Sequence, residues 1–297
     1  QLVYADELAT KDYQYYELFK KLEMQDSQWK SLNDYACNFG MKLILDIFGR
    51  KSLKIAEHLG IDTIKVHGTD VTNIELLKAI KNSSIKSVIL GIGGSYLGEI
   101  KNAIEVLKRK HLILLCGFQG YPTKTQDNQI IRMKSIKEKI KSIHPDFQMG
   151  FADHTESPEF SSTLSLVAIG AGAQIIEKHL TLGKIMKMED FESALNPDEF
   201  YDFVNQLKAG EQALGEIAKK EDFGMSNSEK KYRENVRRDV VAKKDIKKGE
   251  ILNAKNLTLK RTSNPRSIKQ MELIIGKKVN KGIKKNQPLI KRYIDQI

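Results

Sequence analysis

The sequence predicts an α/β fold built on a parallel sheet. Short β-rich apolar runs recur at intervals of roughly 22 to 35 residues, and segments with helical spacing lie between them. A strand followed by a helix, six times over, is the pattern of parallel βα units. No Gly-rich motif of the G-x-G-x-x-G type opens a helix, which favours a (β/α)8-type barrel over an open doubly wound sheet.

The elements follow in order along the chain. The predicted strands are the apolar runs Lys42–Phe48, Thr63–His67, Ser87–Ile92, His111–Gln119, Gln148–Asp153 and Gln174–His179. The predicted helices carry apolar residues three or four positions apart, over Ser52–Leu59, Asn73–Ile80, Tyr96–Arg109, Asp127–Ile143 and Phe160–Ile169. Six units are two fewer than a closed barrel of eight requires, so we expect the first two βα units to be absent from this sequence.

The composition changes toward the C-terminus. From Asn227 to Ile297 the chain has 21 Lys or Arg against 7 Asp or Glu, whereas the preceding residues have 28 against 31. The net charge of +11 therefore belongs to the tail alone. We expect a barrel over residues 1–221, a linker over 222–236 and a second domain over 237–297.

The second domain is predicted to be small and β-rich. Its β-like stretches are Arg238–Ala242, Leu257–Lys260 and Lys277–Val279, separated by turn residues, so little helix is expected there. A basic tail invites a nucleic-acid or polyanion hypothesis, with binding that falls steeply with salt. Tyr232 and Tyr293 are its only aromatic residues, which argues against nucleic acid as a partner.

The composition also bounds the compartment. A chain of 297 residues with 40% hydrophobic content can bury a large core. Only Cys37 and Cys116 are present, so neither a disulfide framework nor a thiolate zinc cluster is indicated. No apolar run approaches the ~18 residues of a membrane span and no signal peptide opens the chain, so we expect a cytoplasmic protein without a membrane partner.

Two histidines stand at the ends of predicted strands. His154 closes the run that begins at Met149, and His179 closes the run that begins at Gln174. The carboxyl ends of barrel strands are where catalytic side chains gather, and two imidazoles there could share one metal ion. A strand-end histidine can also be only a hydrogen-bonded structural group, and that is the interpretation given to the other four, His67 among them.

Several segments, in this order and spacing, resemble the sialic acid (N-acetylneuraminate) synthase family. In the predicted barrel they are Tyr121–Thr123, Gly150–His154, Ile176–Thr181 and Asn196–Phe200. The tail is similar to the antifreeze-like SAF domain that follows the barrel in those synthases, in Arg237–Arg238, Ala242–Glu250, Asn256–Thr258, Lys260–Arg261 and Ile275–Lys277. The resemblance implies a TIM barrel whose third to eighth strands are the six found here. The absent strands would carry an acidic residue and a phosphate-contacting lysine.

The resemblance also implies an activity. Such enzymes condense phosphoenolpyruvate with an N-acetylated amino sugar, N-acetylmannosamine or a relative, and release phosphate and a nine-carbon 2-keto acid. A divalent cation, Mn²⁺ or Mg²⁺, assists. The family forms homodimers, in which the residue matched by Arg261 reaches the partner subunit's active site and grips the sugar.

The family's chemical roles fall on four residues of the predicted barrel. His154 and His179 match the metal ligands, whose cation polarises the sugar aldehyde. Glu177 matches an acidic neighbour that orients a ligand or moves a proton, although a Glu-Lys ion pair is the alternative. Asp190 matches an aspartate that contacts the sugar and the metal's water; because the surrounding residues depart from the family pattern, Glu189 is a second candidate.

Further residues match substrate contacts. Lys65 matches a lysine that meets the phosphate of phosphoenolpyruvate, while Gln119 and Tyr121 match positions that face substrate after the sixth strand. Lys178 matches a basic neighbour of His179. Strand alternation places Glu177 on the same side as His179 and Lys178 on the other side.

Three departures from the family concern one ligand. Small hydroxyl residues usually hold phosphoenolpyruvate at positions that are here Gly68, Gly91 or its neighbour, and Ala152. The backbone N–H groups of the turn at Gly91–Gly94 could compensate, because such turns bind phosphate. The alternative to an active synthase is therefore a catalytically impaired homologue that has lost phosphoenolpyruvate binding.

Overall fold

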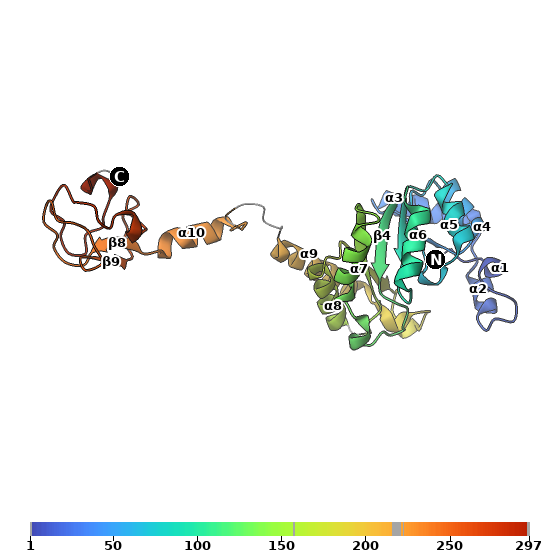
Figure 1. Cartoon of the computed structure of the whole chain (residues 1–297). Helices are drawn as coiled ribbons and strands as arrows, with labels where there is room; N and C mark the ends of the chain where they lie inside the picture. Colours follow the sequence, from blue (N-terminus) through green and yellow to red (C-terminus); the bar gives the residue numbers. More distant parts are fainter. Residues whose placement is uncertain (1, 157, 216–220, 222, 296–297) are drawn as a thin grey trace. The chain divides into compact units, whose positions relative to one another are not determined.

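The computed structural model describes residues 2–156, 158–215, 221 and 223–295. They divide into two compact units, one extending to Gly215 and the other following it. Across the described residues, no helix is both long and apolar enough to cross a bilayer. Figure 1 shows the helices and strands of each unit.

The first unit is a curled sheet of seven parallel strands in the order β1 to β7. The strands are β1 Leu45–Ile47, β2 Thr63–Val66, β3 Ser87–Gly91, β4 His111–Cys116, β5 Phe147–Asp153, β6 Ile175–Leu180 and β7 Ala194–Leu195. Leu2 adds one further parallel bridge, to Ile47 of β1. The predicted α/β fold with a parallel, barrel-type sheet is confirmed, although six strands were predicted and seven are present.

Among the described residues three helices precede β1, five alternate with β1 to β6 and cover one face of the sheet, and one follows β7 (Figure 1). They are α1 Ala5–Leu8, α2 Tyr16–Leu22, α3 Asp26–Asn38, α4 Arg50–His58, α5 Ile74–Lys81, α6 Leu97–Leu107, α7 Arg132–Lys141, α8 Pro158–Gly170 and α9 Pro197–Leu214. Short 3₁₀ turns lie at Gly68–Asp70, Thr125–Asn128, Lys184–Met186 and Phe191–Ser193.

Local chemistry sets where several helices begin. Asn73 accepts a hydrogen bond from the Leu76 N–H at 3.1 Å and so caps α5. At α9 the Glu199 carboxylate accepts from the Asn196 N–H at 2.8 Å, and Pro197 takes the first helical position, where its missing N–H costs nothing.

The sheet has apolar layers on both faces. The larger core lies between strands and helices and includes Ile64, Leu90 and Phe151, all fully buried. A smaller cluster of Ile89, Ile113, Leu115 and Ala152, with Ile175 packed against it, is formed by alternate residues of β3 to β6. Because successive strand residues point to opposite faces, this second cluster lies inside the curl, on the face that also carries the candidate site.

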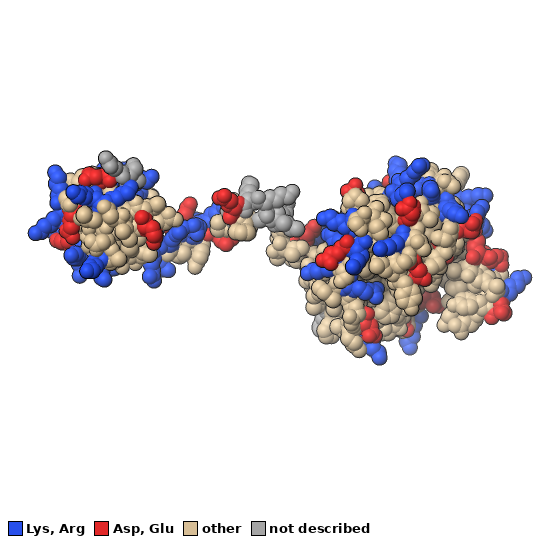
Figure 2. Space-filling model, in the orientation of Figure 1, with Lys and Arg blue, Asp and Glu red and all other residues tan. Residues whose placement is uncertain are grey.

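The second unit contains α10 Asn227–Val236, β8 Asp239–Ala242 and β9 Leu257–Lys260, with 3₁₀ turns at Met271–Leu273 and Lys291–Tyr293. Strands β8 and β9 pair antiparallel, and isolated bridges such as Val279 to Ile294 connect the remaining loops. Beyond α10, no α-helix is found in the described residues, as predicted. The residues expected as a linker contain α10. Lys and Arg are spread over the visible face of this unit (Figure 2).

Candidate functional site

Two imidazoles meet at the carboxyl edge of the sheet. His154 directly follows β5, and His179 is near the end of β6, the next strand in the sheet. Their ring centroids are 5.2 Å apart, with 60° between the ring planes. The structure therefore brings together the two residues that the sequence predicted to share a metal.

Tyr121 completes an aromatic cluster with them. Its ring lies 5.4 Å from His154 and 5.7 Å from His179, edge to face in both cases. The Tyr121–Pro122 peptide bond is cis. The Thr123 N–H donates to the His154 carbonyl at 2.9 Å, and the Ser193 hydroxyl donates to the same oxygen at 2.7 Å. Two separate loops thus fix the backbone of His154.

Asp190 enters the site from the loop after β6. Its Oδ2 lies 3.8 Å from the Nδ1 of His179, and its backbone has a left-handed φ of 61°. This carboxylate, by charge and hydrogen bonding, adds to the effect of burial in raising the pKa of the Tyr121 phenol. The phenol therefore stays protonated and can donate a hydrogen bond near neutral pH.

Burial keeps both imidazoles neutral. It lowers the pKa of His154 to about 4, and the neighbouring His179 lowers it further. Burial also lowers the pKa of His179, against the attraction of Asp190 and Glu177. Neutral imidazole is the form that binds a metal ion, and the Nδ1 of His154 is buried without a hydrogen-bond partner in the described part of the chain.

The donor set fits a divalent cation in part. Two imidazoles could supply nitrogen ligands and Asp190 could supply oxygen at the same edge, a mixture that suits several divalent ions. Within residues 2–156, 158–215, 221 and 223–295, no three His, Cys, Asp or Glu side chains are gathered closely enough to form a ready-made ligand cluster. Water or substrate oxygens would have to complete the coordination.

Lys65 lies inside the curl between two carboxylates. Its Nζ donates to Glu177 Oε1 at 2.9 Å and lies 3.4 Å from Asp46 Oδ2. Burial alone would lower the pKa of Lys65, but the charges of Asp46 and Glu177 outweigh it and raise the pKa. Burial raises the pKa of Asp46, and the charge of Lys65 opposes that rise.

The glycines at the ends of β2 and β3 are held in close backbone contact. A Cβ on Gly91 would lie 2.9 Å from the Gly68 nitrogen, and a Cβ on Gly68 would lie 3.0 Å from the Gly93 oxygen. A hydroxyl side chain at either position would force the backbone apart. In the described residues the N–H groups of Gly93 and Gly94 donate no hydrogen bond, so both could serve a phosphate.

Lys178 points away from this cluster, as strand alternation predicted. Its Nζ lies 3.0 Å from Asp153 Oδ2 and donates to the Thr155 carbonyl at 2.8 Å. Both side chains of the ion pair are almost completely buried, at 1% and 0% exposure. This position gives no support to a substrate contact by Lys178, because its ammonium already holds β5 to β6.

The other two predicted substrate residues, Gln119 and Arg261, belong to different units. Gln119 is exposed in the loop after β4, three residues beyond the strand end. Arg261 belongs to the second unit, where its Nε donates to the Val236 carbonyl at 3.1 Å and its side chain remains exposed.

Sequence reasoning missed two acids of this region. Asp46 lies within a predicted apolar strand, and a lone aspartate in such a run is a signal of a buried partner. Asp153 is the last residue of a predicted strand. In both cases the partner comes from another strand, Lys65 for Asp46 and Lys178 for Asp153.

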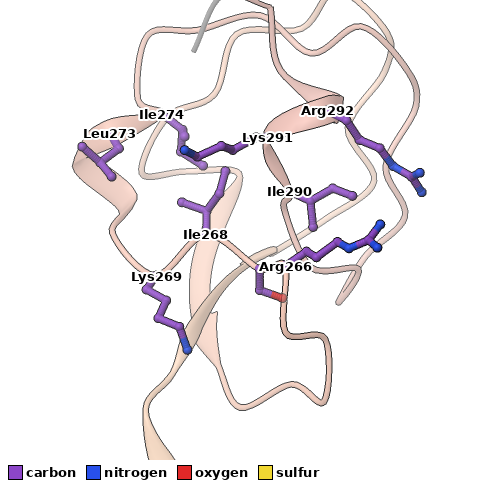
Figure 3. A pocket seen from close by; sticks show the side chains of 9 residues that line it. Arg266, Ile268, Lys269, Leu273, Ile274, Ile290, Lys291 and Arg292 are labelled. Atoms are coloured by element: carbon purple, nitrogen blue, oxygen red, sulfur yellow. The ribbon is translucent and has the colours of Figure 1, made fainter. Parts of the chain in front are cut away.

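The second unit contains a cavity of about 630 Å³ that none of the predicted site residues lines. Ile268, Ile274 and Ile290 form its apolar floor. Figure 3 shows Arg266 and Arg292 extending on one side of this floor and Lys269 on another.

Comparisons with known proteins agree with the geometry. The model described as NeuB family matches residues 2–219, and the one described as SAF domain matches residues 237–291. An N,N'-diacetyllegionaminic acid synthase of Campylobacter jejuni is 33% identical over 276 residues, which make up 91% of this chain and 78% of that protein.

Two solved structures share the architecture. N-acetylneuraminic acid synthetase of Leptospira borgpetersenii superposes with a TM-score of 0.70 at 25% identity, covering 80% of each chain. A putative spore coat polysaccharide biosynthesis protein E of Chromobacterium violaceum gives a TM-score of 0.80 over 99% of this chain and 85% of that one; at 21% identity, this likeness concerns the fold.

Proposed function

Because this chain belongs to the NeuB family and is an enzyme that forms a C–C bond by condensation, we propose that it joins phosphoenolpyruvate to an N-acetylated amino sugar. The amino sugar is N-acetylmannosamine or a relative, and the products are a nine-carbon 2-keto sugar acid and phosphate. The observation that carries the proposal is the cluster of His154, His179, Tyr121 and Asp190 at the carboxyl edge of a barrel-type sheet.

The proposed reaction assigns work to each part of the site. The enol carbon of phosphoenolpyruvate attacks the sugar aldehyde, the aldehyde oxygen takes up a proton, and water adds to the carbon that loses phosphate. Lys65 and the free N–H groups of Gly93 and Gly94 would bind the phosphate. Tyr121, kept protonated, would donate a hydrogen bond to a sugar oxygen, and Asp190 and Glu177 would move protons.

His154 and His179 would hold a divalent cation, Mn²⁺ or Mg²⁺. When bound, such an ion supplies Lewis-acid polarisation of a carbonyl, which is worth several kcal/mol of barrier. The chain's contribution is to keep both imidazoles neutral through burial and to fix the backbone of His154 through Thr123 and Ser193.

The test is phosphate release from phosphoenolpyruvate with Mn²⁺ and a panel of N-acetylmannosamine and its diacetamido relatives. Release that depends on one sugar should be abolished in His154→Ala and retained in His58→Ala, an exposed histidine on α4. The sugar that gives release identifies the substrate. No release with any sugar, in a protein that still binds Mn²⁺, would instead establish an impaired homologue.

A homodimer is part of the proposal, with Arg261 of one subunit serving the barrel of the other. Mixing Arg261→Ala and His154→Ala subunits tests this arrangement, because each mixed dimer then contains one intact site. Random exchange should restore about a quarter of the wild-type rate from two inactive parents. If the mixture stays inactive while subunit exchange is demonstrated, Arg261 does not act on the partner.

A further inference from the structure

One ammonium group inside the curl is shared by two carboxylates. Asp46 and Lys65 are direct partners in the register of β1 and β2, so both side chains stand on the same face of the sheet. Glu177 approaches the same ammonium from β6, on the far side of the curl. Lys65 thus spans the interior between strands that are not neighbours.

The two carboxylates are not equivalent. The Asp46 side chain is 7% exposed, whereas that of Glu177 is 29% exposed. Asp46 is the shorter side chain and is anchored opposite Lys65 on the adjacent strand. Glu177 forms the one aligned hydrogen bond to the ammonium, since neither Asp46 oxygen accepts a hydrogen bond from the described residues.

A phosphate that binds Lys65 must compete with this arrangement. With both carboxylates ionised, the three groups carry a net charge of −1, which repels an anion at low dielectric. An ammonium is a compact point charge with three donors, and its hydrogen bond to Glu177 already has the geometry that a phosphate oxygen would take. The more exposed carboxylate on the longer side chain is the one that can leave.

We propose that Glu177 is an internal competitor of phosphoenolpyruvate: its carboxylate occupies the ammonium of Lys65 in the ligand-free protein and is displaced when the phosphate binds, while Asp46 keeps Lys65 in place. This inference rests on the proposed function, because that function assigns the phosphate to Lys65. It makes Glu177 a two-position residue, and the released carboxylate lies two residues from His179 on the same strand face.

The distinguishing result is a gain of affinity. Titration calorimetry with phosphoenolpyruvate, and separately with inorganic phosphate, is done without sugar, so that no turnover occurs. We expect Glu177→Gln to bind both anions at least about tenfold more tightly than wild type, the equivalent of one charge-assisted hydrogen bond of about 1.4 kcal/mol. An ordinary binding or structural role for Glu177 would leave the affinity unchanged or weaken it.

Three variants make the result specific. Glu192→Gln removes the same charge from the loop after β6, where no contact with Lys65 is found in the described residues, and should change affinity less than twofold. Lys65→Met should abolish the gain in the Glu177→Gln background. Glu177→Ala repeats the test with a second side chain, and thermal melts verify that each variant is folded.

The outcomes separate the two proposals. Equal or weaker binding by both Glu177 variants overturns the competition, and so does a gain that persists without Lys65 or appears equally in Glu192→Gln. If the wild type shows no sugar-dependent phosphate release but Glu177→Gln still binds both anions more tightly, the proposed function is overturned and the competition stands.

Discussion

The buried pair of Lys178 and Asp153 gives the sharpest prediction for stability. Replacing Lys178 by Met keeps an unbranched side chain of similar length but removes the ammonium that lies 3.0 Å from Asp153 Oδ2. Asp153 Oδ1 retains its hydrogen bonds from Thr155, at 3.0 Å from the N–H and 2.6 Å from the hydroxyl. Oδ2 would remain a fully buried anion without a cation, because the carboxylate is 0% exposed.

The cost follows from that burial. Removing one partner of a buried ion pair costs about 3–5 kcal/mol, because the other charge is left uncompensated. For a unit of this size each kcal/mol shifts Tm by about 2–4 °C, so Lys178→Met should lower the Tm of the first unit by roughly 6–20 °C. Removing both charges, in Asp153→Asn with Lys178→Met, should recover most of this loss because no unpaired charge remains.

Calorimetry and urea unfolding measure the effect. The matched control is Lys108→Met, which removes the cation of an exposed pair with Glu105 and should change stability by less than about 0.5 kcal/mol. If Lys178→Met costs under 1 kcal/mol, or if the double variant is no more stable than the single one, the assignment of Lys178 to holding the strands together is refuted.

Three further predictions concern backbone contact and the two thiols. Gly91→Ala should lower the free energy of unfolding in urea by about 1–3 kcal/mol, because its Cβ would press on Gly68. Gly98→Ala, with open space around it in α6, should raise that free energy by about 0.4–1 kcal/mol. Equal effects of the two substitutions would contradict the packing argument. In the native protein at neutral pH, a thiol reagent should modify the exposed Cys37 and spare the buried Cys116, and mass spectrometry of the labelled peptides checks this. Burial raises the pKa of the Cys116 thiol to about 11, so the thiol's contribution to stability is fully present below the unfolded-state pKa of 9.0 and is lost as pH rises from 9.0 to about 11. Cys116→Ala should therefore flatten this part of the plot of unfolding free energy against pH, relative to wild type. Parallel plots for the two proteins would argue against this expectation.

The sequence predicted those parts of the fold that have a local signal. The strands β2 to β6 lie in β-rich, largely apolar runs, and alternation along β6 correctly assigned Glu177 and Lys178 to opposite faces. The two-residue strand β7 has no sequence pattern of its own. It is held in the sheet by a backbone hydrogen bond in which the Thr181 N–H donates to the Leu195 carbonyl. Pattern reasoning finds elements longer than a turn and misses shorter ones.

The candidate site shows the same division. Residues that end strands, such as His154 and His179, were found because position along a strand is visible in sequence. The partners of Lys65 were not, since Asp46 and Glu177 come from strands at opposite sides of the curl. The close contact of Gly68 with Gly91 was equally invisible, because the two glycines come from neighbouring strands whose separation is set by the folded backbone.

The bond between Lys65 and Glu177 also has a mechanical consequence. In a flat sheet β2 and β6 would be separated by four strand spacings, about 19 Å, which no lysine side chain can bridge. The 2.9 Å contact therefore works as a tie across the bend of the sheet. An anion that breaks the contact between Lys65 and Glu177 removes a restraint on the curvature of the sheet. A pair of fluorophores on α5, which follows β2, and on α8, which precedes β6, should therefore report phosphate binding as a change in the distance between them.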